Sequence, residues 1–434
     1  MKKKSKTTHR TVSGGSDVVL NEVTLLAKRA KAAGAALALM DSKTKNNALL
    51  SMAAALREAK SAILSANEKD VEAATKAGET KAFIDRLTLT GSRIDAMAES
   101  LNEMARFDDP VGEVLREWTR PNGLKIRQIR VPMGVIGMIY ESRPNVTVEA
   151  AGLCLKAGSA VILRGGSDAF HSNSLLVDVI SEAAREMKIP DGTIQLLPPQ
   201  DRRSITVLSQ LTGLVDMIVA RGSEEMIKSV TAQATVPVLG HGKGVCHVYI
   251  DKSADVKKAV NIAFNAKVQR PGVCNAMETL LVHESVMYDV LPPLAEKYLK
   301  AGVEMRGDER VTGLLSHATA ASPLDWKTEY LDKIISIKVV GSLEEAIAHI
   351  NEYGSGHTES IVTGDPKAAD LFQKAVDASC VMVNASTRLH DGSVFGFGAE
   401  IGISTQKLHA RGVMGLRELL TTKYLVDGDG HIRE

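Results

Sequence analysis

The chain has 434 residues, more than a single hydrophobic core usually serves, so its length predicts two domains. Lys and Arg number 53 and Asp and Glu 52, and the resulting formal charge of +1 gives no overall field for holding nucleic acid or an anionic membrane. Hydrophobic residues make up 44% of the chain and aromatic residues 4%, which is typical of helix-covered parallel sheets built from Ala, Val, Leu and Ile.

The N-terminal segment and the cysteines indicate the cell compartment. Residues 1–17 are basic and polar, and only Val18, Val19 and Leu20 follow before Asn21, so we expect a disordered leader and not a signal peptide. A charge-free apolar run of about 18 residues, as a membrane span needs, is missing from the sequence. The cysteines form no C-x-x-C pair, which favours a reducing cytosol; they are Cys154, Cys246, Cys274 and Cys380.

The first elements in chain order are helices and a hairpin. Residues 19–77 are rich in Ala, Leu, Lys and Glu, which predicts two or three helices, one of them capped by Asp41 or Ser42. Two β-prone runs within residues 112–133 flank Pro-Asn-Gly, which predicts a hairpin. This arginine-rich hairpin either pairs with another subunit or lies on the surface, and the pattern leaves both possibilities open.

Two series of strand–turn–helix units follow. Residues 159–251 alternate apolar runs, glycine turns and amphipathic segments, as in "SAVILRGGSDAF" and "VDMIVARGSEEMIKSV", which predicts a doubly wound parallel sheet. A second series begins near Ala254 and includes "METLLVH", "ISIKVVGSLEEAIAHI" and "SIVTGDPKAADLF". The pattern therefore predicts two α/β domains.

Two glycine turns are candidate phosphate sites because each joins the end of a strand to the start of a helix. Helix N-termini at that edge of a sheet present free N–H groups and a partial positive charge. Neither turn is a G-x-G-x-x-G, and tight turns also use glycine without any ligand. A nearby guanidinium can pair with the 2′-phosphate of NADP. The candidate cofactor-binding residues are Arg164, Gly165, Gly166, Ser167, Arg221, Gly222 and Ser223.

Residues 240–244, "GHGKG", do not form a nucleotide-hydrolysing loop, because the spacing of G-x-x-x-x-G-K-[ST] fails. Cys246 and His247 are expected on opposite faces of a strand, so we predict no metal site there.

Asn145 and Cys274 are each open to two interpretations. Asn145 either caps a helix that begins near Val146 or donates a hydrogen bond to an oxyanion, and the pattern alone favours the cap. Cys274 follows an Arg-Pro-Gly turn, with Lys267 and Arg270 close in sequence. A catalytic thiol needs cations or a helix N-terminus to lower its pKa, and the turn is expected to expose it before a helix. Spacing alone favours a structural cysteine.

The C-terminal segment after residue 383 is rich in glycine and polar residues but carries Phe395 and Phe397, a composition that favours a functional loop over a disordered tail. Arg388, His390 and Asp391 are candidates for binding a small anionic substrate. Arg143 and Arg270 are further substrate-binding candidates.

Five segments, in this order, resemble the gamma-glutamyl phosphate reductases, the proline-biosynthesis branch of the aldehyde dehydrogenase superfamily. They are "VPMGVIGMIYESRPNVTVEA", "ILRGGSDA", "QRPGVCNAMETLLVH", "VNASTRLHDG" and "FGAEIGISTQKLHARGVMGL". The resemblance covers essentially everything after about residue 18.

The resemblance implies an NADPH-dependent reduction of L-glutamyl 5-phosphate to L-glutamate 5-semialdehyde, with release of phosphate. Cys274 matches the catalytic cysteine that forms a thioester, and Asn145 matches the oxyanion-hole asparagine, which overrides the capping interpretation. Glu329 resembles the glutamate that holds the nicotinamide ribose. Gly222 and Ser223 are then expected beside the pyrophosphate, and Arg164 near the adenosine ribose.

One departure from the wider superfamily bears on the reaction. Aldehyde-oxidising members carry a glutamate that activates water for thioester hydrolysis, and Leu239 stands at the matching place here. Without that general base, attack of water on the thioester is slow, which argues against plain aldehyde oxidation.

The resemblance also implies an aldehyde dehydrogenase-like α/β fold, with a Rossmann-type cofactor domain, a catalytic domain and a β-hairpin oligomerisation element. The expected domains are an NADP-binding domain of residues 18–111 and 134–240 with part of 385–414, a catalytic domain of 241–384, and an oligomerisation element of 112–133 and 415–434. A homodimer or homotetramer is expected. The chain has no amino-acid kinase segment, so a separate glutamate 5-kinase is the expected functional partner.

Two rival interpretations remain at this point. The first is an aldehyde dehydrogenase with another substrate, and the second is a nucleotide-binding scaffold without catalysis. A requirement for phosphate distinguishes the first, and an unreactive Cys274 would favour the second.

Overall fold

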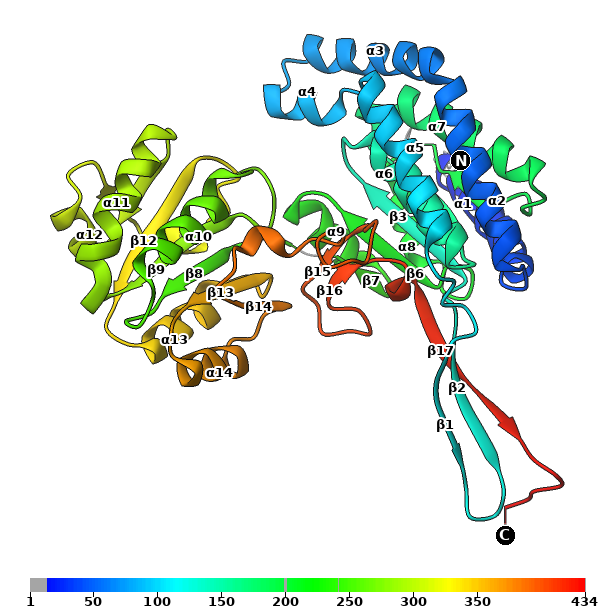
Figure 1. Cartoon of the computed structure of the whole chain (residues 1–434). Helices are drawn as coiled ribbons and strands as arrows, with labels where there is room; N and C mark the ends of the chain where they lie inside the picture. The colour runs from blue at the N-terminus through cyan, green and yellow to red at the C-terminus, as the bar shows by residue number, and fades with distance from the viewer. Residues whose placement is uncertain (1–13, 199–200, 241, 434) are drawn as a thin grey trace, which may run out of the picture. The chain divides into compact units, whose positions relative to one another are not determined.

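The computed structural model describes residues 14–198, 201–240 and 242–433 (Figure 1). Contacts divide the chain into two compact units. The first unit comprises Met1–Ala220, Ser229–Val238 and Leu419–Glu434, and the second comprises Arg221–Lys228 and Leu239–Glu418. All of residues 385–414 belong to the second unit, whereas part of that segment was expected with the cofactor domain. Their hydrogen bonds explain the grouping, because Lys407 and Arg411 both bind Asp377 of the second unit.

The first unit begins with helices, as the composition predicts. They are α1 (Gly14–Leu37), α2 (Ser42–Glu58), α3 (Lys60–Lys76), α4 (Lys81–Leu87) and α5 (Gly91–Arg106). Asp41 caps α2, and its carboxylate accepts the N–H of Thr44 at 2.7 Å.

The expected leader needs one correction. Residues 1–13 lie outside the described residues, but residues 14–17 belong to α1. The buried stripe of α1, which includes Val23, Ala27 and Ala30, fixes the helix against the body of the unit. Extension of a formed helix adds one hydrogen bond per residue, so the helix continues into the polar segment.

A five-stranded sheet forms the core of the first unit. Its strand order is β5-β4-β3-β6-β7, with β3 at Val135–Tyr140, β4 at Ala160–Arg164, β5 at Ile194–Leu196, β6 at Met217–Arg221 and β7 at Val238–Leu239. The chain runs from β3 to β5 in one direction and from β6 to β7 in the other, so the order reverses between β3 and β6. Such a switch point is where open α/β sheets bind ligands. The connecting helices are α6 (Pro144–Lys156), α7 (Phe170–Glu186), α8 (Arg203–Gln210) and α9 (Glu224–Gln233).

The predicted hairpin is present and has a third strand. β1 (Val114–Thr119) and β2 (Lys125–Pro132) are antiparallel, and β17 (Leu420–Asp427) pairs with the other edge of β2 (Figure 1). The C-terminal strand thus joins the hairpin, as the resemblance implies. Every residue of β1 is exposed, and the ring of Trp118 lies edge-on to that of Tyr424 at 6.2 Å.

The second unit contains a seven-stranded sheet of order β11-β10-β12-β9-β8-β13-β14, in which all neighbouring strands are parallel. Its strands are β8 (Cys246–Ile250), β9 (Met277–His283), β10 (Glu304–Gly307), β11 (Thr319–Ala320), β12 (Ile334–Val340), β13 (Thr358–Val362) and β14 (Cys380–Val383). The predicted α/β fold is therefore confirmed in both units.

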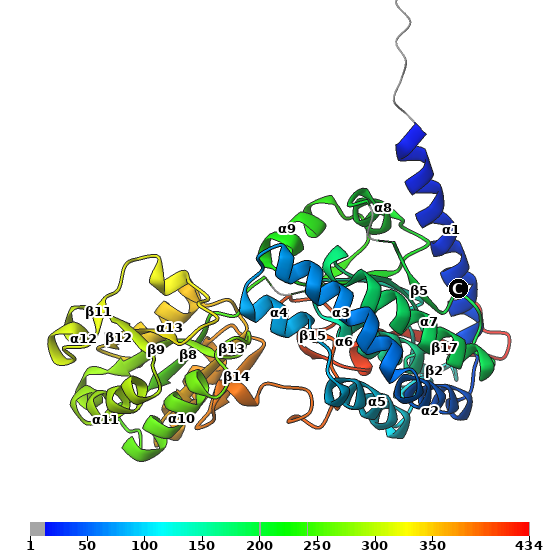
Figure 2. The ribbon, with the colours of Figure 1, turned by 90° about the horizontal axis from the view of Figure 1, so that it is seen from above.

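Helices cover both faces of this sheet (Figure 2). On one face α10 (Val256–Val268), α11 (Met287–Lys300) and α12 (Glu309–Leu314) bury a large apolar cluster, and on the other α13 (Leu343–Tyr353) and α14 (Pro366–Ala375) bury a smaller one. Two short antiparallel strands, β15 (Gly402–Ser404) and β16 (Gly412–Met414), lie within the expected C-terminal loop.

Among the described residues, no helix combines the length and apolar character needed to cross a membrane.

Candidate active site

Cys274 lies in a turn between the end of α10 and the start of β9, and it is partly exposed. The expectation of a helix after this cysteine is wrong. The apolar run after it forms β9, which pairs with β8 on one side and β12 on the other. The strand agrees with the assignment of "METLLVH" to the second series of strand–turn–helix units. No helix N-terminus therefore follows Cys274.

The backbone of Cys274 is held at its carbonyl group. The buried Cys246 thiol donates a hydrogen bond to that oxygen at 3.2 Å, and burial raises the pKa of Cys246 well above its usual value, which keeps the thiol protonated. Gly244 packs so closely that a Cβ atom there would lie 1.9 Å from the same oxygen. The sequence pattern gave Gly244 no role.

The Arg388 guanidinium binds the residue next to Cys274. Arg388 donates from Nε to the side chain of Gln269 at 2.8 Å and from Nη1 to the side chain of Asn275, the residue after Cys274. Burial and the charge of Arg270 lower the pKa of Arg388, while Asp391 and Cys274 act in the opposite direction. The positive charges of Arg388 and Arg270 repel each other, and a pair of cations of this kind favours a thiolate and binds anionic groups.

Replacing Arg388 by Met is expected to shift the pH profile of Cys274 alkylation by iodoacetamide towards higher pH by about one unit, because the thiolate loses a nearby cation. The matched control is Arg310→Met, which removes an exposed guanidinium paired with Glu284 at 3.0 Å. An unchanged profile in the Arg388 variant would show that Arg388 does not stabilise the thiolate.

Lys267, expected as a cation beside Cys274, has a different partner. Its Nζ lies 2.6 Å from Glu278 Oε2, and both side chains are fully buried. Burial raises the pKa of Glu278 to about 7, although Lys267 opposes this shift. Because Lys267 is neutralised by this contact, Arg388 and Arg270 are the better candidates for activating the thiol.

The structure also corrects the interpretation of His390. Its side chain is 1% exposed, its Nδ1 lies 2.8 Å from Thr358 Oγ1, and burial lowers its pKa to about 4. The imidazole is therefore neutral near pH 7 and does not offer a charge to an anion. Its carbonyl accepts the side-chain amide of Asn275 at 2.9 Å, so His390 helps to fix the residue next to the nucleophile.

Glu329 reaches the same part of the second unit. Its Oε1 accepts the N–H of Gly244 at 2.9 Å, and burial raises its pKa. The carboxylate is thus connected, through Gly244, to the backbone of Cys274.

The turn after β4, in the first unit, is closely packed around two glycines. A Cβ atom on Gly165 would lie 2.2 Å from Asn173 Nδ2, and one on Gly166 would lie 2.1 Å from Asp168 Oδ1, so a side chain at either position would have to displace a neighbouring side chain. Phe170, Asn173, Leu196 and Leu197 surround both glycines. Ser167 begins the following 3₁₀ turn, and Arg164 ends β4, with its pKa lowered by burial and by the charge of Arg202. The two cations at this turn suit a phosphate group.

The second glycine turn follows β6. Arg221 donates from Nη1 to the carbonyl of Ile401 at 3.1 Å, Gly222 comes next, and Ser223 accepts the N–H groups of Met226 and Ile227 at the start of α9. Ser223 thus lies at a helix N-terminus, as the pattern predicts.

The capping interpretation of Asn145 is wrong. Helix α6 begins at Pro144 with Arg143 at the N-cap, so Asn145 lies inside the first turn. Proline is favoured at that first position because its missing N–H is not needed there. The Asn145 side-chain amide donates to Glu149 Oε1 at 3.0 Å, which fixes its orientation. Arg143 and Asn145 belong to the first unit, whereas Cys274, Arg270, Arg388 and His390 belong to the second.

Comparisons with known proteins give a consistent result. The aldehyde dehydrogenase family matches residues 1–329 and 314–423. The chain is 52% identical over 413 residues to the gamma-glutamyl phosphate reductase of Caldanaerobacter subterraneus subsp. tengcongensis, covering 95% of this chain and 100% of that protein. The crystal structure of gamma-glutamyl phosphate reductase from Thermotoga maritima is similar with a TM-score of 0.93 at 47% identity, over 95% of this chain and 100% of that one. An acetylating aldehyde dehydrogenase from Geobacillus thermoglucosidasius shares the fold, with a TM-score of 0.70 at 19% identity, over 98% of this chain and 100% of that one.

Proposed function

We propose that the chain reduces L-glutamyl 5-phosphate to L-glutamate 5-semialdehyde and releases phosphate, a step of proline biosynthesis. The reason is that the chain belongs to the aldehyde dehydrogenase family and, within it, to the gamma-glutamyl phosphate reductases. The observation that carries this proposal is the partly exposed Cys274 with Arg388 beside it, in a chain that matches such a reductase over 95% of its length. An acyl phosphate suits this site, because the two guanidinium groups favour both the thiolate and the anionic leaving group.

In the proposed reaction the Cys274 thiolate attacks the acyl carbon and the C–O bond to phosphate breaks, which leaves a thioester and free phosphate. A bound nicotinamide cofactor supplies the hydride that the conversion of the acyl group to an aldehyde requires. Collapse of the resulting thiohemiacetal returns the thiolate and releases the aldehyde. Asn145 and the Cys274 N–H are proposed to donate hydrogen bonds to the tetrahedral oxyanions.

The family uses a nicotinamide dinucleotide, and the cofactor proposed for this chain is NADPH. Arg164, near Arg202, is the proposed partner of the 2′-phosphate. Gly165, Gly166 and Ser167 are proposed to contact the same end of the cofactor. Arg221, Gly222 and Ser223 are proposed beside the pyrophosphate, and Glu329 at the nicotinamide ribose. Support comes from the glycine turns and from the helix N-terminus at Ser223.

Two proposals concern partners. The exposed strand β1 and the Trp118–Tyr424 pair are proposed to join subunits of a homodimer or homotetramer, because unpaired strand edges readily pair with another chain. A separate glutamate 5-kinase is proposed to supply the acyl phosphate.

The reaction is testable in reverse. Purified protein given NADP and glutamate semialdehyde is expected to reduce NADP at least about tenfold faster with inorganic phosphate than without it, because phosphate must resolve the thioester. Leu239 is a buried strand residue with no titratable group, which supports slow attack by water. Equal rates with and without phosphate would instead identify a hydrolysing aldehyde dehydrogenase.

A further inference from the structure

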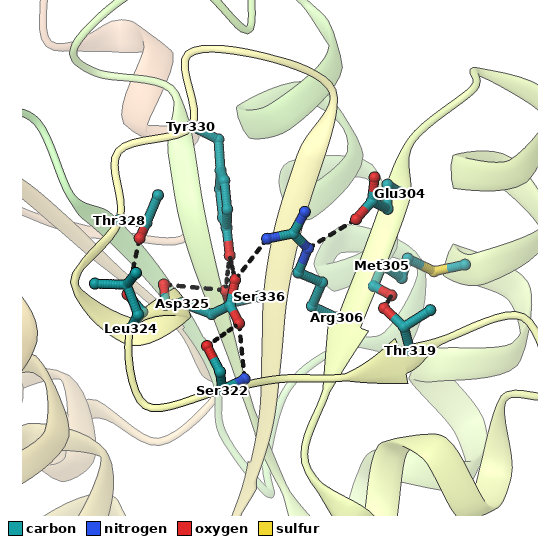
Figure 3. A network of polar contacts seen from close by, with 10 residues as sticks. All are labelled: Glu304, Met305, Arg306, Thr319, Ser322, Leu324, Asp325, Thr328, Tyr330 and Ser336. Atoms are coloured by element: carbon teal, nitrogen blue, oxygen red, sulfur yellow. Dashed lines mark hydrogen bonds and ion pairs between the residues drawn. The ribbon is translucent and has the colours of Figure 1, made fainter.

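Residues 325–331 of the second unit, which include Glu329, are bound at both ends by buried polar contacts. At the first end, Asp325 Oδ2 accepts the N–H and the hydroxyl of Ser322, both at 2.7 Å, and Oδ1 accepts Arg306 Nη1 at 2.7 Å (Figure 3). Although burial acts against it, these hydrogen bonds lower the pKa of Asp325. The carboxylate is therefore charged and fully engaged.

Tyr330 connects the segment to the sheet. Its hydroxyl donates to Asp325 Oδ1 at 2.7 Å and lies 2.7 Å from Ser336 Oγ on β12 (Figure 3). Arg306 lies over its ring, with the guanidinium carbon 5.2 Å from the ring centroid, and Lys267 Nζ lies 5.9 Å from the same centroid. Burial raises the pKa of Tyr330 to about 12, so the hydroxyl keeps its proton and remains a donor.

The other end of the segment, at Leu331, is bound by the buried ion pair of Lys267 and Glu278. The N–H of Leu331 donates to Glu278 Oε1 at 3.3 Å, while Glu278 Oε2 binds Lys267. Leu331 has a φ of 54°, in the left-handed region that a leucine rarely adopts. A residue in that conformation persists only where its surroundings fix it, so both ends of the segment are constrained.

Between these ends the segment contacts the loop that leads from β7 to β8. Lys243 Nζ donates to the carbonyl of Lys327 at 2.8 Å, and the N–H of Gly244 donates to Glu329 Oε1 at 2.9 Å. A carboxylate has about four lone-pair sites, so Glu329 can hold Gly244 and still accept further hydrogen bonds.

We infer that Asp325 and Tyr330 are positioning residues that hold Glu329 in the orientation in which its carboxylate accepts the ribose hydroxyls of the nicotinamide cofactor. This inference rests on the proposed function, in which Glu329 binds that ribose. The two residues act through Glu329, because their own polar groups are engaged with Arg306, Ser322 and Ser336.

The test is a titration of NADPH fluorescence. Replacing Tyr330 by Phe removes the hydroxyl that reaches Asp325 and Ser336 and keeps the ring. The Kd for NADPH is expected to rise about tenfold, which is the effect of losing about one hydrogen bond between Glu329 and the cofactor. Thr328→Val is the matched control, because it removes a hydroxyl of the same segment that donates to the carbonyl of Leu324 at 2.8 Å. The control is expected to keep the Kd within about twofold.

A double-mutant cycle with Glu329→Gln separates positioning from a general loss of structure. If Tyr330 acts through Glu329, Tyr330→Phe changes the Kd by less than about twofold once Glu329 is Gln. The same tenfold factor in both backgrounds would overturn the inference. The Kd for NADPH is measured without turnover. A protein that lacks phosphate-dependent activity would therefore disprove the proposed function, and the double-mutant cycle would still test the positioning role of Tyr330.

Discussion

Replacing Cys274 by Ala is expected to lower the rate of NADP reduction with glutamate semialdehyde and phosphate by at least about 10⁴-fold. The proposed route has no other group that forms the acyl intermediate, and loss of a catalytic nucleophile in other enzymes costs up to about 10⁶-fold. Alanine removes only the sulfur, at a position that is already partly exposed, so the fold should be retained.

The control for this variant is Cys380→Ala. Cys380 begins the edge strand β14, and burial raises its pKa to about 11, so its thiol is unreactive near neutral pH. Wild-type activity is expected in the control. NADPH binding measured by fluorescence should be unchanged in both variants, which separates loss of the nucleophile from unfolding. Substantial turnover in Cys274→Ala would contradict the thioester route and favour a different nucleophile.

The architecture was predictable because its signals are local. Apolar runs ending in glycine turns predicted β4 and β6 with the helices that follow them, and the Pro-Asn-Gly turn predicted the pairing of β1 with β2. The fold followed from such patterns and from the resemblance together.

The surroundings of the nucleophile were less predictable. Cys274 was expected before a helix, whereas strand β9 follows it, flanked by β8 and β12. The cation beside it also depends on tertiary contacts. Lys267 is close in sequence but is neutralised by Glu278, whereas Arg388 reaches Asn275 across 113 residues.

The roles of His390 and Asn145 were also not predictable from the sequence pattern. The composition of the C-terminal segment marked His390 as an anion ligand, but burial lowers the pKa of its imidazole to about 4 and keeps the ring neutral, while Nδ1 contacts Thr358 Oγ1. Asparagine is a common N-cap, yet the helix starts at Pro144, two residues earlier than expected, and the Asn145 amide donates to Glu149. Burial decides the role of His390, and the position of the first helical residue decides that of Asn145. The types of these two residues reveal neither feature.

Gly244 gives a prediction that only the structure supports. A Cβ atom at this position would lie 1.9 Å from the carbonyl oxygen of Cys274, 2.6 Å from its carbonyl carbon and 2.8 Å from its Cα. All three atoms are backbone, so no flexible side chain can move away. Gly244→Ala must therefore displace the nucleophile or the strand beside it, and the hydrogen bond from Gly244 to Glu329 with it.

We expect Gly244→Ala to lower kcat at least about 100-fold, because misplacing a reacting group by about 1 Å costs that much in other enzymes. Gly272→Ala is the matched control: it lies two residues before Cys274, but its Cβ would meet only the carbonyl oxygen of Leu331, at an ordinary 3.6 Å. Both proteins should be compared by kcat, by the rate of Cys274 alkylation and by Tm. Full activity in Gly244→Ala would show that the carbonyl of Cys274 is free to move during catalysis, whereas a selective loss of kcat with a near-normal Tm would establish that this close backbone contact sets the position of the thiolate.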